Sequence, residues 1–108
     1  MEKKINFKNR FENKKYPSLF DVFKLGDRVK ITYSKNNGNL DDYSGLIMGI
    51  YNDNIDIFWD TLNGKYQPQK IKNMFTNCKL NDIFEGNKNY SPIKKEKYIF
   101  KDIIIKLH

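Results

Sequence analysis

The fold is decided by residues 44–59, which read SGLIMGIYNDNIDIFW. Over residues 54–59, inward isoleucine and tryptophan alternate with outward residues, and this period of two is typical of a half-buried strand. The preceding strand, expected from Ser44 to Tyr51, carries Gly45 and Gly49. Glycines inside a strand mark a bulge or a sharp bend, which strands need when they curl around a small barrel. An Asn-Asp pair separates the two strands, so we expect a strongly bent antiparallel hairpin.

The same reasoning extends in both directions along the chain. Val29, Ile31 and Tyr33 alternate with charged or polar residues and predict another strand. The Asn-Gly pair at 63–64 is the strongest hairpin signal in the chain. The other expected elements are a helical turn over 18–23 with Ser18 as N-cap, a polar loop over 34–43, a returning strand over 65–68, a closing segment over 69–74, a short helix over 77–85 stopped by Gly86, a polar linker over 87–97 and a strand over 98–107.

Three segments resemble the small SH3-like barrels of the KOW and Tudor type: Leu25–Ile31, Tyr43–Ile50 and Ile55–Asp60. In those barrels a Gly-Asp turn opens the first strand, a glycine starts a bent second strand, and the third strand ends in an aromatic residue followed by an acid. The resemblance covers Leu25 to Phe75 and implies a role in binding RNA, DNA or peptides. The long 34–43 loop departs from the compact turn with which KOW modules touch RNA. We expect a mainly β fold with minor α, a small SH3-like antiparallel β-barrel with a short N-terminal helical turn and a C-terminal strand.

Charge divides the chain into regions. We expect a basic aromatic arm over 1–16, the barrel with its helical lead-in over 17–75, and a basic linker with the terminal strand over 76–108. Residues 1–24 hold seven bases and three acids, 25–75 hold six of each, and 76–108 hold seven bases and four acids. A barrel that gripped phosphates should carry excess cations. Contact with nucleic acid or an acidic surface is therefore expected from the flanks, through Lys3, Lys4, Lys8, Arg10, Lys14, Lys15, Lys94 and Lys95.

The overall composition gives two opposing indications. A net charge of +7 and a pI of about 9.4 point to an anionic partner. However, the chain has no alanine and only Arg10 and Arg28 beside eighteen lysines, which is typical of AT-rich genomes. Arginine is the better ligand for phosphates and guanine edges. In style the chain resembles small accessory proteins of phages or mobile elements in low-GC bacteria, many of which block host or defence complexes.

Phe58 is the centre of the expected protein-binding surface. The alternation places it on the face opposite the inward isoleucine and tryptophan, with Asp56 and Asp60 beside it. A large aromatic residue on a neutral face rimmed by acids is typical of a contact hot spot. We include Tyr51 in this set. The alternative is that the terminal strand folds back and buries Phe58.

The strand aromatics allow two interpretations. They belong to the hydrophobic core, or some of them form a cage for a cation, as the resemblance to Tudor-type barrels implies. The residues concerned are Tyr33, Tyr43, Tyr51, Phe58, Trp59 and Tyr66.

The chain lacks the usual parts of a catalytic or metal site. His108 is the last residue, Cys78 is the only cysteine, and the aspartates at 41, 42, 53, 56 and 60 do not have the spacing of a calcium loop or a nuclease site. We expect no enzyme activity, no cofactor and no bound metal. The lone cysteine favours a reducing cytoplasm, and no stretch approaches eighteen apolar residues, so we expect no membrane segment.

Two functions remain, with a small hydrolase as a poor third. The preferred one is an accessory or inhibitor protein that docks on a larger protein or nucleoprotein complex, with its neutral barrel against protein and its basic flanks against acidic surface. The alternative is an autonomous RNA- or DNA-binding module of the SH3-like kind.

Overall fold

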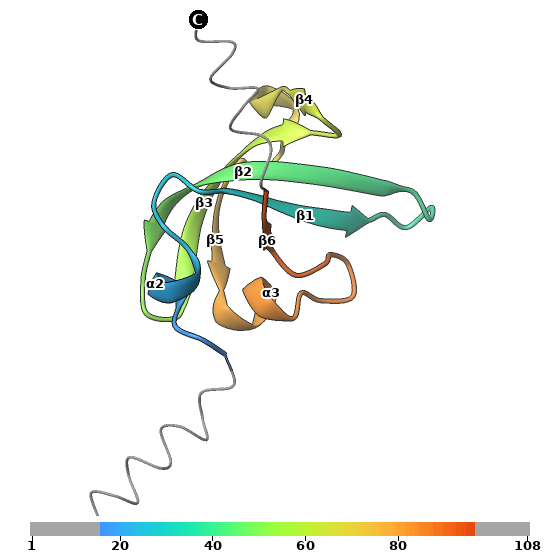
Figure 1. Ribbon diagram of the computed structural model, residues 1–108. Helices are drawn as coiled ribbons and strands as arrows, with labels where there is room; N and C mark the ends of the chain where they lie inside the picture. Colours follow the sequence, from blue (N-terminus) through green and yellow to red (C-terminus); the bar gives the residue numbers. More distant parts are fainter. Residues whose placement is uncertain (1–15, 97–108) are drawn as a thin grey trace, which may run out of the picture.

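The computed structural model describes residues 16–96, which form one antiparallel six-stranded sheet and two short helices (Figure 1). The strand order is β4-β3-β2-β1-β6, and β5 pairs with the first part of β3. The elements are α2 (Leu19–Val22), β1 (Arg28–Ser34), β2 (Leu40–Ile50), β3 (Asn54–Leu62), β4 (Lys65–Tyr66), the 3-10 turn η1 (Pro68–Lys70), β5 (Phe75–Lys79), α3 (Leu80–Phe84) and β6 (Lys94–Lys95).

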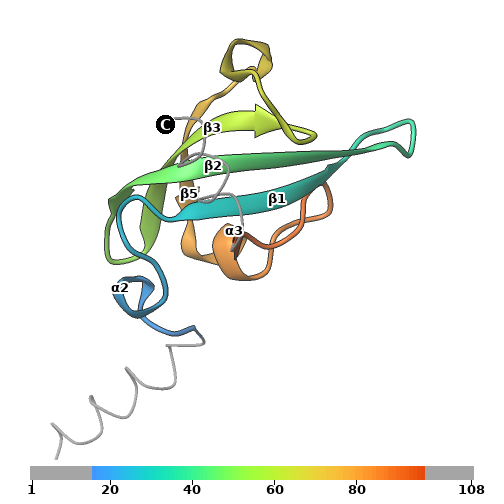
Figure 2. The ribbon, with the colours of Figure 1, turned by 45° about the horizontal axis from the view of Figure 1, so that its top comes forward.

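The two glycines of β2 lie where the sheet bends. The register between β2 and β3 shifts between Ser44 and Gly45 and again between Ile47 and Gly49, so each site is a bulge. At Gly45 the strands approach closely, since a Cβ atom there would lie 2.6 Å from the Phe58 carbonyl oxygen. The bends let the long β2 and β3 strands curve across the molecule (Figure 2).

Strand β3 divides its free edge between two partners. Its first five residues pair with β5, and its last two pair with β4 across a two-residue turn. In that turn Asn63 has φ 51° and Gly64 has φ 84°, the two positive values that the favoured hairpin turn requires. The hairpin predicted from this Asn-Gly pair is confirmed.

The hydrophobic core lies between the inner face of the sheet and the helices, which sit on the same side of β1 and β2 (Figure 1). The Ser18 hydroxyl accepts a hydrogen bond from the Phe20 amide and so caps α2, as predicted. Leu19, Ile55 and Ile83 are fully buried and join the two helices to the sheet. The two helices therefore cover one end of the inner face of the sheet.

The loop expected over 34–43 and the helix expected over 77–85 are both shorter in the structure. Strand β2 already begins at Leu40, because Asp41 and Asp42 pair with Tyr33 and Thr32 of β1. The helix covers only Leu80–Phe84, since the preceding residues form β5.

The segment expected as a polar linker also belongs to the sheet. Ile93 is buried, and β6 pairs with β1. The structure thus confirms a mainly β fold with small helices, whereas the sheet of the described residues is open and a closed barrel is not confirmed. The terminal strand expected over 98–107 lies outside the described residues. No helix in residues 16–96 is long and apolar enough to cross a membrane.

Candidate functional site

Phe58 lies on the outer face of the sheet, as the alternation predicts, but it is half-buried. Its ring stacks on that of Phe75, its partner in β5, with 4.9 Å between the ring centroids. Phe75 is 68% exposed and Met48 of β2 is 54% exposed. These three side chains form the apolar part of what we call the outer patch, and Phe75 is its most exposed aromatic ring.

A hydrogen-bonded carboxylate forms the rim of the outer patch. Asp56 accepts hydrogen bonds from the Tyr51 hydroxyl at 2.9 Å and from the Asn77 amide at 2.7 Å. The bonds from Asn77 and then from Tyr51 lower the pKa of the Asp56 carboxyl, because they stabilise its charged form. The pKa of Tyr51 is correspondingly raised by its hydrogen bond to Asp56. The rim therefore carries a fixed negative charge at neutral pH.

Asp60 does not belong to this rim, although it follows Phe58 on the same strand. It is buried and forms two hydrogen bonds with the Arg28 guanidinium, of 2.7 and 2.6 Å. Thr61 accepts a third bond from Arg28 at 3.3 Å. The bulge at Ser44/Gly45 adds a residue to β3 at this point, so the strict alternation used to place Asp60 is interrupted.

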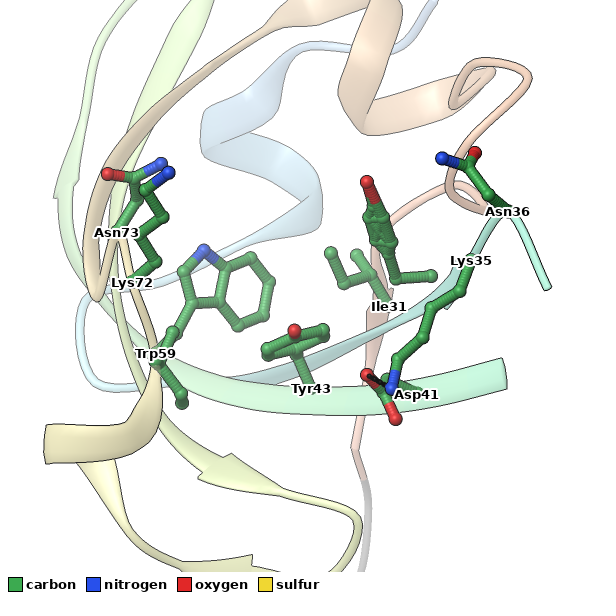
Figure 3. A pocket seen from close by; sticks show the side chains of 10 residues that line it. Ile31, Lys35, Asn36, Asp41, Tyr43, Trp59, Lys72 and Asn73 are labelled. Atoms are coloured by element: carbon green, nitrogen blue, oxygen red, sulfur yellow. Dashed lines mark ion pairs between the residues drawn. The ribbon is translucent and has the colours of Figure 1, made fainter. Parts of the chain in front are cut away.

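A second candidate site, which we call the aromatic pocket, opens at the end of the inner face. It has a volume of about 510 Å³. The β1–β2 register aligns Ile31 with Tyr43 and Tyr33 with Asp41, so these four side chains lie on one face of the sheet. The lining residues are Ile31, Tyr33, Lys35, Asn36, Asp41, Tyr43, Trp59, Ile71, Lys72 and Asn73. In Figure 3 the side chains of Trp59, Tyr43 and Ile31 converge on this space.

The rings of Tyr33 and Tyr43 form an angled wall, with centroids 6.4 Å apart and planes inclined by 51°. Burial, followed by the nearby Asp41 charge, raises the pKa of Tyr43, so its hydroxyl stays protonated. Trp59 is buried at the base. Of the six strand aromatics considered above, Tyr33, Tyr43 and Trp59 meet here.

Charged groups stand on both sides of the pocket mouth (Figure 3). On one side Lys35 lies 3.1 Å from Asp41, and the Asn63 amide also donates to that carboxylate. The hydrogen bonds from Asn63 and Lys35 lower the pKa of Asp41. On the opposite side Lys72 is exposed and makes no ion pair with the described residues. Within residues 16–96 the Asp41 charge is thus matched by Lys35, and the Lys72 charge has no acidic partner.

The basic residues expected in the flanks are only partly within the described region. Lys94 and Lys95 are exposed on β6, and the Lys95 ammonium lies 3.7 Å from Asp27 and donates to the Val22 carbonyl at 3.3 Å. The other candidate bases lie outside the described residues: Lys3, Lys4, Lys8, Arg10, Lys14 and Lys15.

Sequence reasoning missed the contributions of Phe75 and of Lys72. Lys72 lies between η1 and β5, and Phe75 is the first residue of β5, in a stretch whose sequence carries no clear period of two. Cys78, inward on β5, is half-buried, and burial raises the pKa of its thiol to about 11. No cluster of three or more residues of the metal-ligating types occurs within residues 16–96.

No protein-family model, curated protein or solved structure matches the chain. The two sites must therefore be interpreted from their own chemistry.

Proposed function

We propose that this chain is a non-enzymatic binding protein that docks on a partner protein through the outer patch. The observation that carries the proposal is the Phe58–Phe75 stack. It presents a ring that is 68% exposed on a hydrogen-bonded sheet. Aromatic residues held by rigid elements lose little conformational freedom on binding and dominate interface energies.

The chemistry of the patch specifies the partner surface. Met48 and Phe75 line a depression together with Asp56 and Asn77. The partner should present an apolar side chain to the rings and a lysine, arginine or backbone N–H to the Asp56 carboxylate, since an ionised acid at an interface requires a complementary donor.

The composition supports an accessory or inhibitory role on a nucleic-acid-handling complex. Bases outnumber acids in both flanks, while residues 25–75 are neutral. A neutral sheet that contacts protein, with basic flanks beside it, suits attachment to a nucleoprotein. The lysine-rich, alanine-free sequence is the reason to place this role in a phage or mobile element.

The test compares Phe75→Ala with Tyr66→Ala. The two aromatics are matched in exposure, at 68% and 66%, but Tyr66 lies on β4 outside the patch. A partner is first purified with the full chain from the native host, with and without nuclease. Phe75→Ala should then weaken its measured affinity by on the order of 30-fold, as loss of a hot-spot aromatic does, and Tyr66→Ala should not.

Equal affinities of the two variants would refute docking at the outer patch. Loss of the partner after nuclease treatment would instead favour an autonomous nucleic-acid-binding module. Phe58→Ala is a less clean variant, because the half-buried ring supports Phe75 and its removal should lower both affinity and stability.

A further inference from the structure

We propose that the aromatic pocket binds a base of a single-stranded nucleic acid, with Lys72 at the adjoining phosphate. This site is separate from the outer patch and does not depend on the docking proposal. It also differs from the basic residues of the two flanks, because it lies within the part of the chain that has no net charge.

The shape of the pocket suits a flat ring. A volume of about 510 Å³ is within the usual range of ligand sites, roughly 300–1,000 Å³. Tyr33 and Tyr43 offer inclined ring faces, and Ile31 and Ile71 add apolar contacts. Bases unstacked from a single strand bind by stacking on such aromatic faces.

Charge distinguishes a nucleotide from a cation. Aromatic faces attract an ammonium group, whereas a second cation close by repels it. Here the Asp41 carboxylate already pairs with Lys35, at 3.1 Å, and Lys72 adds an ammonium on the other side. The lining is thus positive by one charge, which repels a cationic ligand and attracts a phosphate.

The remaining polar lining groups can read a base edge. The Asn36 and Asn73 side chains come from the two sides of the pocket, and neither amide is hydrogen-bonded to another described residue. Each amide offers both a donor and an acceptor, the combination found on base edges. Base selectivity is therefore expected to reside in these two asparagines.

Trp59 is the only tryptophan and lines this pocket, so a ligand bound there should change its fluorescence. We would titrate the full chain with dT12, rU12 and dA12 and, in parallel, with a trimethyl-lysine peptide. At least one oligonucleotide should quench the emission, and the peptide should not. Tyr33→Ala should reduce oligonucleotide affinity about ten-fold, as loss of one stacking partner does, and Tyr66→Ala should leave it unchanged.

Lys72→Gln provides a second variant at an exposed position, where folding is not at risk. It should make the negative slope of log K against log salt shallower by about 0.7, the value for one phosphate contact on a single strand. Lys79→Gln, an exposed lysine outside the pocket, is the matched control. Phe75→Ala should bind oligonucleotide normally, which separates this site from the outer patch.

Two results would overturn the proposal. The first is that Tyr33→Ala and Lys72→Gln both bind oligonucleotide as tightly as the unmutated chain. That result would place the nucleic acid on the flanks. The second is quenching by the trimethyl-lysine peptide with none by any oligonucleotide, which would make the pocket a cation cage.

Discussion

The Arg28 guanidinium of β1 and the Asp60 carboxylate of β3, which are 32 residues apart in the sequence, are buried together beside the bend in β2. Two parallel hydrogen bonds join Arg28 to Asp60, and Thr61 donates to Asp60 as well as accepting from Arg28. The Arg28 Nε atom alone has no partner among the described residues. Because both charges are withdrawn from water, each depends on the other for compensation.

Removal of either partner should therefore destabilise the chain severely. We expect Asp60→Asn to reduce the free energy of unfolding by about 3 kcal/mol, since it leaves a buried, uncompensated guanidinium. The double variant Arg28→Met/Asp60→Leu should recover part of that loss. Urea denaturation of the single and double variants measures both effects, and a single variant as stable as the parent would contradict this account of the pair.

This pair also shows where residue-level prediction from sequence ends. Alternation correctly placed Phe58 outside and Trp59 inside, because each depends only on its neighbours in β3. The burial of Asp60 depends on a bulge and on a partner in β1, and neither is encoded within its own strand. The aromatic pocket shows the same limit. Its aromatic residues stand out in the sequence, but which of them meet depends on the register of the sheet.

At the scale of the element, Gly45 and Gly49 differ in what surrounds them. A Cβ atom at Gly45 would meet the Phe58 carbonyl at 2.6 Å and the Trp59 ring at 2.8 Å, whereas one at Gly49 would meet the Tyr51 hydroxyl at 2.7 Å. The contacts at Gly45 involve backbone and a buried ring, which cannot move aside. The contact at Gly49 involves the end of an exposed side chain, which can.

Gly45→Ala should consequently cost more stability than Gly49→Ala. We expect a loss of about 2 kcal/mol at Gly45 and under about 1 kcal/mol at Gly49, by the cost of overpacking a filled site. A β-branched residue, as in Gly49→Val, should cost more than alanine, because it displaces the Tyr51–Asp56 hydrogen bond. Thermal melts rank the three variants, and equal stability of the two alanine variants would argue against Gly45 as the critical bend.

The strands that the sequence predicts well are those with an apolar inner face, β1, β2 and β3. Strand β5 is different, since its exposed positions are 75, 77 and 79 and its inward ones are Thr76 and Cys78, which are only half-buried. So weak an alternation does not separate an edge strand from a short helix. Its pairing with β3 supplies the missing information, and that contact is long-range.

For the whole molecule, the distribution of charge distinguishes two modes of binding nucleic acid, which are phosphate contact by the basic arm and base stacking in the aromatic pocket. Residues 1–15 carry six bases and two acids, and their contribution to affinity should be mainly electrostatic. Tyr16 is better kept in any truncation, because its ring stacks on Phe84 and its hydroxyl donates to Glu85.

Deleting residues 1–15 should lower both oligonucleotide affinity and its salt dependence, by up to about 0.7 in slope for each of the six bases that contacts a phosphate. Fluorescence anisotropy at several salt concentrations measures the slope. If the truncated chain keeps the slope of the full chain, the arm makes no phosphate contact. Quenching of Trp59 should persist in the truncated chain, because the pocket is built from residues 31–73.

The half-buried thiol of Cys78 has a practical consequence. With its pKa raised to about 11 by burial, the thiol carries far less thiolate at pH 7 than an ordinary cysteine does. Since this is the sole native cysteine, a second one introduced at an exposed site, such as Tyr66→Cys, would react with maleimide dyes far faster. The native protein is thus already suited to single-site fluorophore attachment without removal of its own thiol.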